Sequence, residues 1–96
     1  MPRLDSWAMF ITPDNEAYLK GIVLGSPAFQ DGKHVKTSHI ENLDLDAMTA
    51  ITHKGTLYHL GRPDAGWIEW LKKSPYRGQG ITSKILAIAE AMGEPN

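Results

Sequence analysis

The pattern of apolar residues changes its period near residue 61, and this change limits the fold more than any other feature of the sequence. Before it, short runs of bulky and β-branched residues alternate with turn signals, which is typical of β-strands. After it, apolar residues recur three and four positions apart, which is typical of helices. A chain of 96 residues can bury one modest core. We therefore expect a single α+β domain over residues 1–96, mainly β over 1–61 and mainly α over 62–93.

Five strands are predicted in the first part of the chain, at residues 7–12, 17–24, 34–40, 48–53 and 56–60. They should form a small, twisted, mostly antiparallel sheet of four or five strands. Gly21 lies inside the second run, where a glycine indicates a bulge or a close approach of another backbone segment. The polar residues 41–46 are predicted to form an exposed acidic loop.

The last two predicted strands should form a hairpin, closed by a two-residue loop at residues 54–55. This loop length would place Ile51 opposite Tyr58. Because side chains alternate along a strand, Ile51, Tyr58 and Leu60 would then share the core face.

Two helices are predicted after the sheet, at residues 67–73 and 82–92. Asp64 can cap the first helix, and the Ser74-Pro75 pair can end it. The second helix has one apolar stripe, made of Ile85, Ile88, Ala89 and Met92. We expect the two helices to cover one face of the sheet.

Several classes of protein are excluded by what the sequence lacks. It contains no cysteine, which rules out disulfides, cysteine nucleophiles and thiolate metal sites. Its longest apolar runs have five residues, whereas a membrane-spanning helix needs about 20. The first residues lack the apolar centre of a signal peptide. We therefore expect a cytoplasmic protein that does not interact with membranes.

No constellation of catalytic or metal-binding residues stands out in the sequence. The four histidines lack the spacing of a zinc-protease helix, and no carboxylate lies at an evident ligand spacing from two of them. Ser38 and His39 are neighbours on a predicted strand, so their side chains should point to opposite faces. We therefore predict no catalytic residues, no metal site and no cofactor, and favour a protein that is not an enzyme. The histidines are His34, His39, His53 and His59.

Aromatic and cationic residues gather around the first predicted helix and the link that follows it. Tryptophan, tyrosine and arginine are enriched at the binding hot spots of protein interfaces. The two tryptophans lie three positions apart, and their helix face can belong either to the core or to an interface. Two acidic residues of the predicted loop complete the expected partner-binding set, which is Trp67, Trp70, Lys72, Lys73, Tyr76, Arg77, Asp44 and Asp46.

Residues 76–82 read Tyr-Arg-Gly-Gln-Gly-Ile-Thr, a glycine-rich link that opens the second predicted helix. Such a link presents free backbone N–H groups to an anion. The segment resembles the acetyl-CoA pyrophosphate loop of the N-acetyltransferase superfamily over about 15 residues. The resemblance implies that Arg77, Gly78, Gly80 and Thr82 would bind the cofactor, although Thr82 stands where that family has glycine or alanine. Alternatively, the glycines serve only as turn residues between two helices.

Residues 35–40 and 52–61 resemble small proteins of unknown function carried by phages and mobile elements, a class that includes anti-CRISPR inhibitors. This resemblance implies a non-enzymatic protein that inhibits or modulates a larger host protein or nucleoprotein complex. The acidic first half of the chain would suit the basic groove of such a partner. The acidic residues in question are Asp31, Glu41, Asp44 and Asp46.

Two alternatives come from other functional classes. The first is a minimal or degenerate acyl-CoA-binding protein that uses the glycine-rich link. The second is a small nucleic-acid-binding domain that uses a strip made of Lys72, Lys73, Arg77 and Lys84. The net charge of −1 disfavours direct nucleic-acid binding, because neutralising phosphates dominates such affinity. The exposed edges of a small sheet also allow a homodimer.

Overall fold

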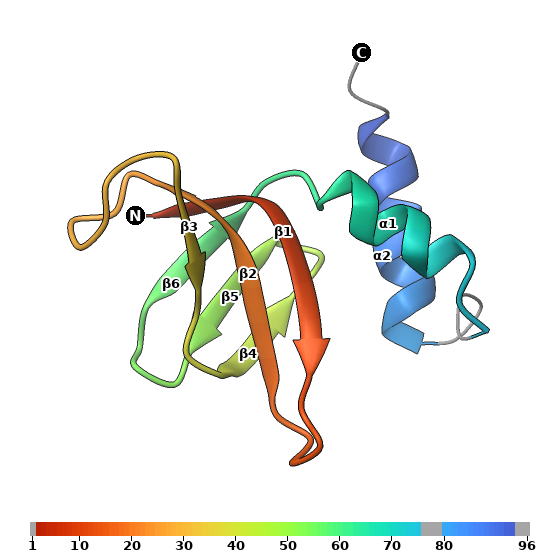
Figure 1. The fold of residues 1–96 in the computed structure, drawn as a ribbon, viewed down its shortest axis with the longest axis horizontal. Coiled ribbons are helices and arrows are strands. Elements are labelled where there is room, and N and C mark those ends of the chain that lie inside the picture. The colour runs from red at the N-terminus through yellow and green to blue at the C-terminus, as the bar shows by residue number, and fades with distance from the viewer. Residues whose placement is uncertain (1, 76–79, 94–96) are drawn as a thin grey trace.

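A computed structural model describes residues 2–75 and 80–93 of the chain. It confirms the predicted α+β class, with a curved sheet followed by two helices that lie side by side (Figure 1). The strands are β1 (Arg3–Ile11), β2 (Ala17–Leu24), β3 (Lys33–Lys36), β4 (Ile40–Asp44), β5 (Thr49–Thr52) and β6 (Leu57–Leu60). The helices are α1 (Ala65–Lys72) and α2 (Gly80–Met92).

The sheet has six strands in the order β3-β2-β1-β6-β5-β4, more than the four or five expected. Four neighbouring pairs are antiparallel, as predicted, and β1 pairs with β6 in parallel, so the sheet is mixed. The first strand is also longer than predicted and begins at Arg3. It runs through the middle of the sheet and is therefore paired on both sides.

The single strand predicted at residues 34–40 is two strands, because the chain bends between β3 and β4. At the bend, Thr37 is buried and tied to β2: its backbone N–H donates to the Leu19 carbonyl (2.8 Å), and its hydroxyl accepts from the Leu19 N–H (3.1 Å). Beyond it the chain pairs with β5 at the other end of the sheet. The prediction of an acidic loop at residues 41–46 is therefore wrong for most of this segment, because β4 extends to Asp44.

The hairpin of β5 and β6 differs from the predicted register by one residue. Ile51 faces Leu57, and Ala50 faces Tyr58. The core face of β5 thus carries Ala50 and Thr52, whereas Ile51 is 38% exposed. The loop is longer than two residues, because the Thr52 N–H donates to the carbonyl of Thr56 rather than to that of a nearer residue.

The core forms around Trp7, which is fully buried although its strand is irregular. The pairing of β1 with β2 shifts register between Asp5 and Ala8, and Ser6 has a φ of 46°. The indole Nε1 of Trp7 donates to the carbonyl of Gly61 at 2.8 Å. At Gly21, the structure shows the close backbone approach that the sequence suggested, with the bulge on the facing strand.

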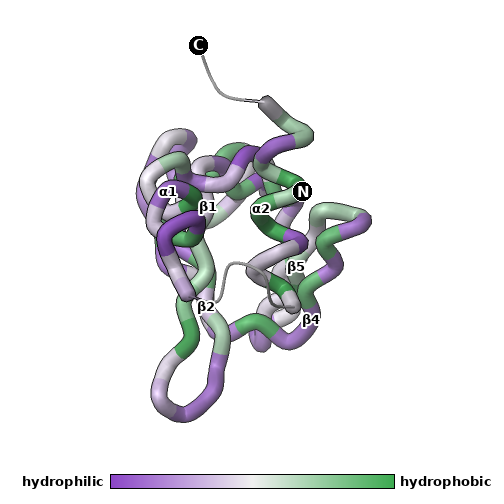
Figure 2. Tube along the Cα trace, turned by 90° about the vertical axis from the view of Figure 1, so that its right-hand side faces the viewer, coloured by the Kyte–Doolittle hydropathy of each residue, from purple (hydrophilic) through white to green (hydrophobic). Residues whose placement is uncertain are grey.

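Both helices contribute to the same core as the sheet. The Asp64 side chain accepts from the Trp67 N–H at 2.9 Å and caps α1, as predicted, and Ile68 and Leu71 are buried. From α2, Ile85 is buried. Figure 2 views this side of the molecule and shows apolar and polar segments alternating along the strands and helices. Neither helix has the length and apolar character needed to cross a membrane, within the residues that the structure describes.

Candidate functional site

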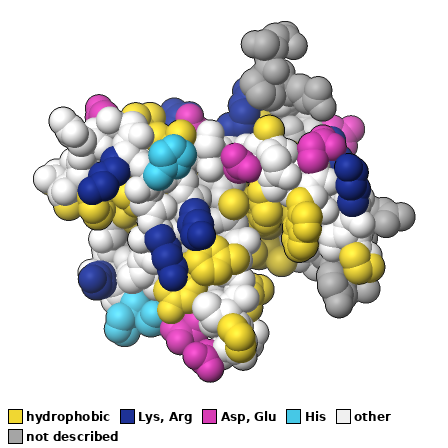
Figure 3. Space-filling model, in the orientation of Figure 1, with side chains coloured by type: hydrophobic (Ala, Val, Ile, Leu, Met, Phe, Trp, Pro, Cys, Tyr) yellow, Lys and Arg dark blue, Asp and Glu magenta, His cyan; other side chains and the backbone are white. Residues whose placement is uncertain are grey.

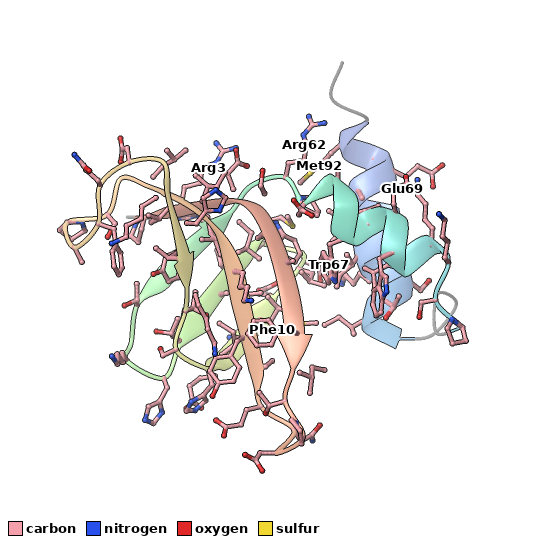
Figure 4. All side chains as sticks on the ribbon, in the orientation of Figure 1. Arg3, Phe10, Arg62, Trp67, Glu69 and Met92 are labelled. Carbon is pink, nitrogen blue, oxygen red and sulfur yellow. The ribbon has the colours of Figure 1, made fainter. Side chains whose placement is uncertain are left out.

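The two tryptophans of α1 have different surroundings. Trp67 is partly buried, and its ring centroid lies 5.5 Å from that of Trp7, at an interplanar angle of 55°. In Figure 4 it points from α1 toward the sheet. Trp70 is 66% exposed and is therefore available to a partner. The sequence left open whether these two tryptophans belong to the core or to an interface. In the structure, Trp67 packs against the core and Trp70 lies on the surface.

The other members of the predicted partner-binding set do not form one surface with them. The Lys72 ammonium lies 3.2 Å from the carboxylate of Glu69, one turn away on the same helix. Lys73 is exposed at the end of α1. Tyr76 and Arg77 lie outside the described residues.

The two acidic residues of that set have partners within the chain. The Asp44 carboxylate accepts from the N–H groups of Asp46 and Ala47, at 3.0 Å each, and so stabilises the turn after β4. The Asp46 carboxylate lies 2.7 Å from the ammonium of Lys84 and joins this turn to α2. Both carboxylates therefore contribute to local structure.

Only part of the alternative cofactor-binding set falls within the described residues. Gly80 opens α2 with a φ of 47°, a left-handed conformation that favours glycine. Thr82 follows in the first turn of that helix. Arg77 and Gly78 lie outside the described residues, so the resemblance to an acetyl-CoA loop stays a prediction.

A denser group of aromatic and cationic side chains occupies the outer face of β1, β2 and β3. Phe10 faces Tyr18 across β1 and β2, with ring centroids 5.5 Å apart and ring planes within 15° of parallel. Lys20 and Lys36 face each other across β2 and β3. We call these four residues the aromatic–lysine patch. Figure 3 shows this face, with dark blue side chains over yellow ones.

Both lysines of the aromatic–lysine patch lie over its rings. The Lys20 ammonium is 5.2 Å from the Phe10 centroid, and the Lys36 ammonium is 5.3 Å from Phe10 and 4.8 Å from Tyr18. Such contacts are each worth about 0.5–1 kcal/mol at exposed sites. Among the described residues, no carboxylate forms an ion pair with either lysine. The patch therefore offers two positive charges held above an apolar surface.

A cluster of ionisable groups adjoins the aromatic–lysine patch. His39 Nε2 and His53 Nδ1 lie 3.1 Å and 2.8 Å from the same oxygen, Oε1 of Glu41. The other nitrogen of His39, Nδ1, lies 3.1 Å from a carboxylate oxygen of Glu16. We call His39, Glu41 and His53 the histidine–glutamate cluster. It touches the patch where the rings of His39 and Tyr18 meet edge to face, with centroids 6.4 Å apart.

The backbone explains why these residues converge. The register of β4 and β5 shifts between Ile40 and Asn42, so Glu41 is the extra residue of a β-bulge, a feature that often re-aims a side chain. The His53 N–H donates to the His39 carbonyl at 2.8 Å, which places the two imidazole rings 4.4 Å apart. Glu16 enters from the turn between β1 and β2.

This cluster was not predicted, because residues 41–46 have the composition of a loop and the histidines lack helical metal-ligand spacing. One local signal was present, since His39 and Glu41 are two positions apart next to a strand. His53 and Glu16 could not have been added, because the bend between β3 and β4 brings them close.

Comparisons with protein-family models, with curated proteins and with solved structures find no match to this chain.

The ionisation of Glu41 should stabilise the fold. Hydrogen bonds from His53 and His39 lower the pKa of this carboxyl below its usual value of 4.5. A lowered pKa stabilises the folded state above the usual value, and this contribution is lost as the pH falls through the lowered one. The difference in melting temperature between the wild type and Glu41→Gln should thus shrink as the pH falls below about 4.5. Melting curves that keep a constant difference would contradict this role.

Proposed function

We propose that this chain is a small non-enzymatic binding module of the cytoplasm, which inhibits or modulates a larger host protein or nucleoprotein complex. We further propose that it meets an acidic segment of that partner through the aromatic–lysine patch. The observation that supports this choice is the pair of stacked rings beneath two lysines that lack a carboxylate partner among the described residues.

The patch combines what a protein-binding hot spot needs. The rings of Phe10 and Tyr18 offer apolar area that is already ordered, so little conformational entropy is lost on binding. The contacts with the rings hold both ammonium groups over the patch before a partner arrives, at 5.2 Å and 5.3 Å from the Phe10 centroid. A carboxylate of the partner would gain a charged hydrogen bond there, at the edge of an apolar contact. This arrangement favours a segment with one or two carboxylates beside an apolar side chain.

The surroundings of the patch favour a protein partner over a nucleic acid. A single strand of nucleic acid carries a negative charge at every nucleotide, and its affinity rises with the number of phosphates neutralised. The patch offers two lysines, and the carboxylates of Glu16 and Glu41 lie close to its Tyr18 side through His39. A peptide can place a single carboxylate between the lysines and avoid that repulsion.

The test is a titration of the isotope-labelled chain with a short synthetic peptide of aspartate and phenylalanine, followed by NMR. We expect shifts that concentrate on β1, β2 and β3. Reversing both charges, with Lys20→Glu and Lys36→Glu together, should weaken binding about tenfold or more, because each exposed ion pair contributes up to about 1 kcal/mol and the new charges repel. The same peptide with asparagine in place of aspartate should bind more weakly to the wild type.

Lys33→Glu is the matched control. The Lys33 ammonium also lies over a ring, 5.4 Å from the centroid of Phe29, but outside the patch. This variant should bind the acidic peptide like the wild type. Unchanged binding by the double variant would overturn the proposed surface. Tighter binding of an oligothymidylate than of the peptide would replace it with the nucleic-acid alternative.

The acyl-CoA alternative and the homodimer stay predictions. The edge strands of the sheet are β3 and β4, and a homodimer through an edge would have to use one of them. Both carry charged residues, which often protect an edge from pairing.

A further inference from the structure

The histidine–glutamate cluster brings three side chains with metal-ligand chemistry to one point on the surface. We propose that His39, Glu41 and His53 bind a divalent transition-metal ion of the zinc class, with Glu16 as the positioning residue for His39. This proposal is independent of the partner surface proposed above, because it uses none of the residues of the aromatic–lysine patch.

The distances between the three ligand atoms fit such an ion after a small adjustment. One nitrogen or oxygen atom from each residue lies within 4.8 Å of the others. Tetrahedral zinc holds nitrogen and oxygen ligands at about 2.0–2.2 Å, which places neighbouring ligand atoms roughly 3.3 Å apart. The observed contacts of the Glu41 oxygen, 3.1 Å to His39 and 2.8 Å to His53, are slightly shorter than this spacing. Entry of the ion therefore requires the Glu41 oxygen to move away from each imidazole nitrogen by about half an ångström or less, while the two histidines adjust around it.

The two ring nitrogens of His39 each lie next to a carboxylate. Nδ1 is 3.1 Å from the carboxylate of Glu16, and Nε2 is 3.1 Å from that of Glu41. An ionised carboxylate offers only acceptor oxygens, which are also metal ligands. A metal ion between Nε2 and Glu41 would be attracted by both carboxylates.

Glu16 gives His39 the support that metal-binding histidines usually have. A ligating histidine commonly donates its second N–H to a carboxylate, which fixes the tautomer and turns the ring toward the metal. The Glu16 carboxylate lies 3.1 Å from Nδ1 of His39, an ion-pair contact that places it to take this role and leaves Nε2 to bind the ion. The backbone of Glu16 is fixed in the turn, because the Thr12 N–H donates to the Glu16 carbonyl at 2.9 Å.

The ligand types define the class of metal. Two imidazoles and one carboxylate suit zinc, nickel and copper, whereas magnesium and calcium prefer oxygen ligands alone. Three protein ligands leave at least one coordination position for water or for an outside ligand, as in open zinc sites. The His53 and Glu41 side chains are 62% and 53% exposed, so such a position would be accessible from solvent.

The first test is isothermal titration calorimetry of the full chain with zinc chloride at about pH 7.5, where ordinary histidines are neutral. We expect one ion per chain. His53→Ala and Glu41→Gln should each weaken binding at least tenfold, and Glu16→Gln should weaken it about tenfold, as loss of an outer partner usually does. Absence of binding, or binding that survives both ligand substitutions, would overturn the proposal.

His34→Ala and His59→Ala are the matched controls, because both histidines are exposed and lie outside the cluster. They should bind zinc like the wild type, and a loss of affinity equal to that of His53→Ala would place the ion elsewhere. Magnesium that binds as tightly as zinc would also contradict the proposed class of metal. The ligands are surface residues, so amide spectra should show that every variant is folded.

The nitrogen chemical shifts of His39 distinguish a metal from a proton. Zinc should leave Nδ1 of His39 protonated, shift Nε2 to a metal-bound value and release a proton to the buffer wherever the ring was doubly protonated. The Glu16→Gln variant should lose this tautomer preference while it keeps residual binding. An Nε2 chemical shift of His39 that does not change when zinc is present in excess would overturn its role as a ligand.

Discussion

Replacing Trp7 with alanine should lower the free energy of unfolding by about 3–5 kcal/mol, the usual cost of truncating a large buried aromatic residue. The side chain has no exposed surface, donates a buried hydrogen bond to the Gly61 carbonyl and packs against Trp67. Alanine would lose these contacts and leave a cavity between the sheet and α1. A domain of this size has a total stability of about 5–14 kcal/mol, so the substitution should remove between about a fifth and all of it.

Urea denaturation, followed by circular dichroism, measures this loss. Trp70→Ala is the matched control, because the same side chain is removed from a position that is 66% exposed. Its effect should be within about 0.5 kcal/mol of zero. Trp7→Phe should fall between the two, because it keeps most of the volume but loses the hydrogen bond. Equal losses for Trp7→Ala and Trp70→Ala would contradict the packing described here.

Gly21→Ala should be destabilising by about 1–3 kcal/mol, the usual cost of forcing an extra methyl group into a packed site. A Cβ atom at this position would lie 2.8 Å from the Asp5 carbonyl oxygen and 2.8 Å from Leu4 Cγ. The first contact is with backbone, which cannot turn away as a side chain can. Without the clash, alanine would favour a strand by about 0.5–1 kcal/mol, so the sign of the effect is diagnostic.

Thermal denaturation of Gly21→Ala and of Gly66→Ala provides this comparison. Gly66 lies in α1, and a Cβ atom there would meet the Asp64 carboxylate at 3.3 Å and nothing else within 4 Å. At position 66 helix propensity favours alanine, but the carboxylate of Asp64 that caps α1 would have to shift slightly, so we expect a smaller effect than at position 21. If Gly21→Ala melted at or above the wild-type temperature, β1 and β2 could not approach each other as closely as described.

The features that the sequence predicted well depend on neighbouring residues. The change of period near residue 61 places the helices after the sheet, and the Asp64 cap marks the start of α1. The turn predicted after residue 12 likewise lies between β1 and β2. The features that the sequence did not predict depend on distant contacts.

The bend after β3 shows why contacts between distant residues could not be predicted from the sequence. Residues 34–40 have the composition of one strand, but the attachment of Thr37 to Leu19 holds the chain where it turns away from β2. The same bend places His39 and Glu41 beside His53. Local secondary-structure propensity cannot predict that these three side chains converge, because they do so only when both ends of the sheet have formed. For the same reason, the register of β5 and β6 could not be derived from the Lys54-Gly55 pair alone.

Because β1 pairs in parallel with β6, one edge of β1 can be paired only after β6 has been made. During synthesis, β1 and β2 can form a hairpin early, but the inner edge of β1 stays without a partner until β6 has been made. Trp7 and Gly61, which share a buried hydrogen bond, are 54 positions apart. Contacts so distant slow the folding of a small domain. A partly folded chain in which β6 is not yet paired would therefore expose the inner edge of β1, which a chaperone could recognise.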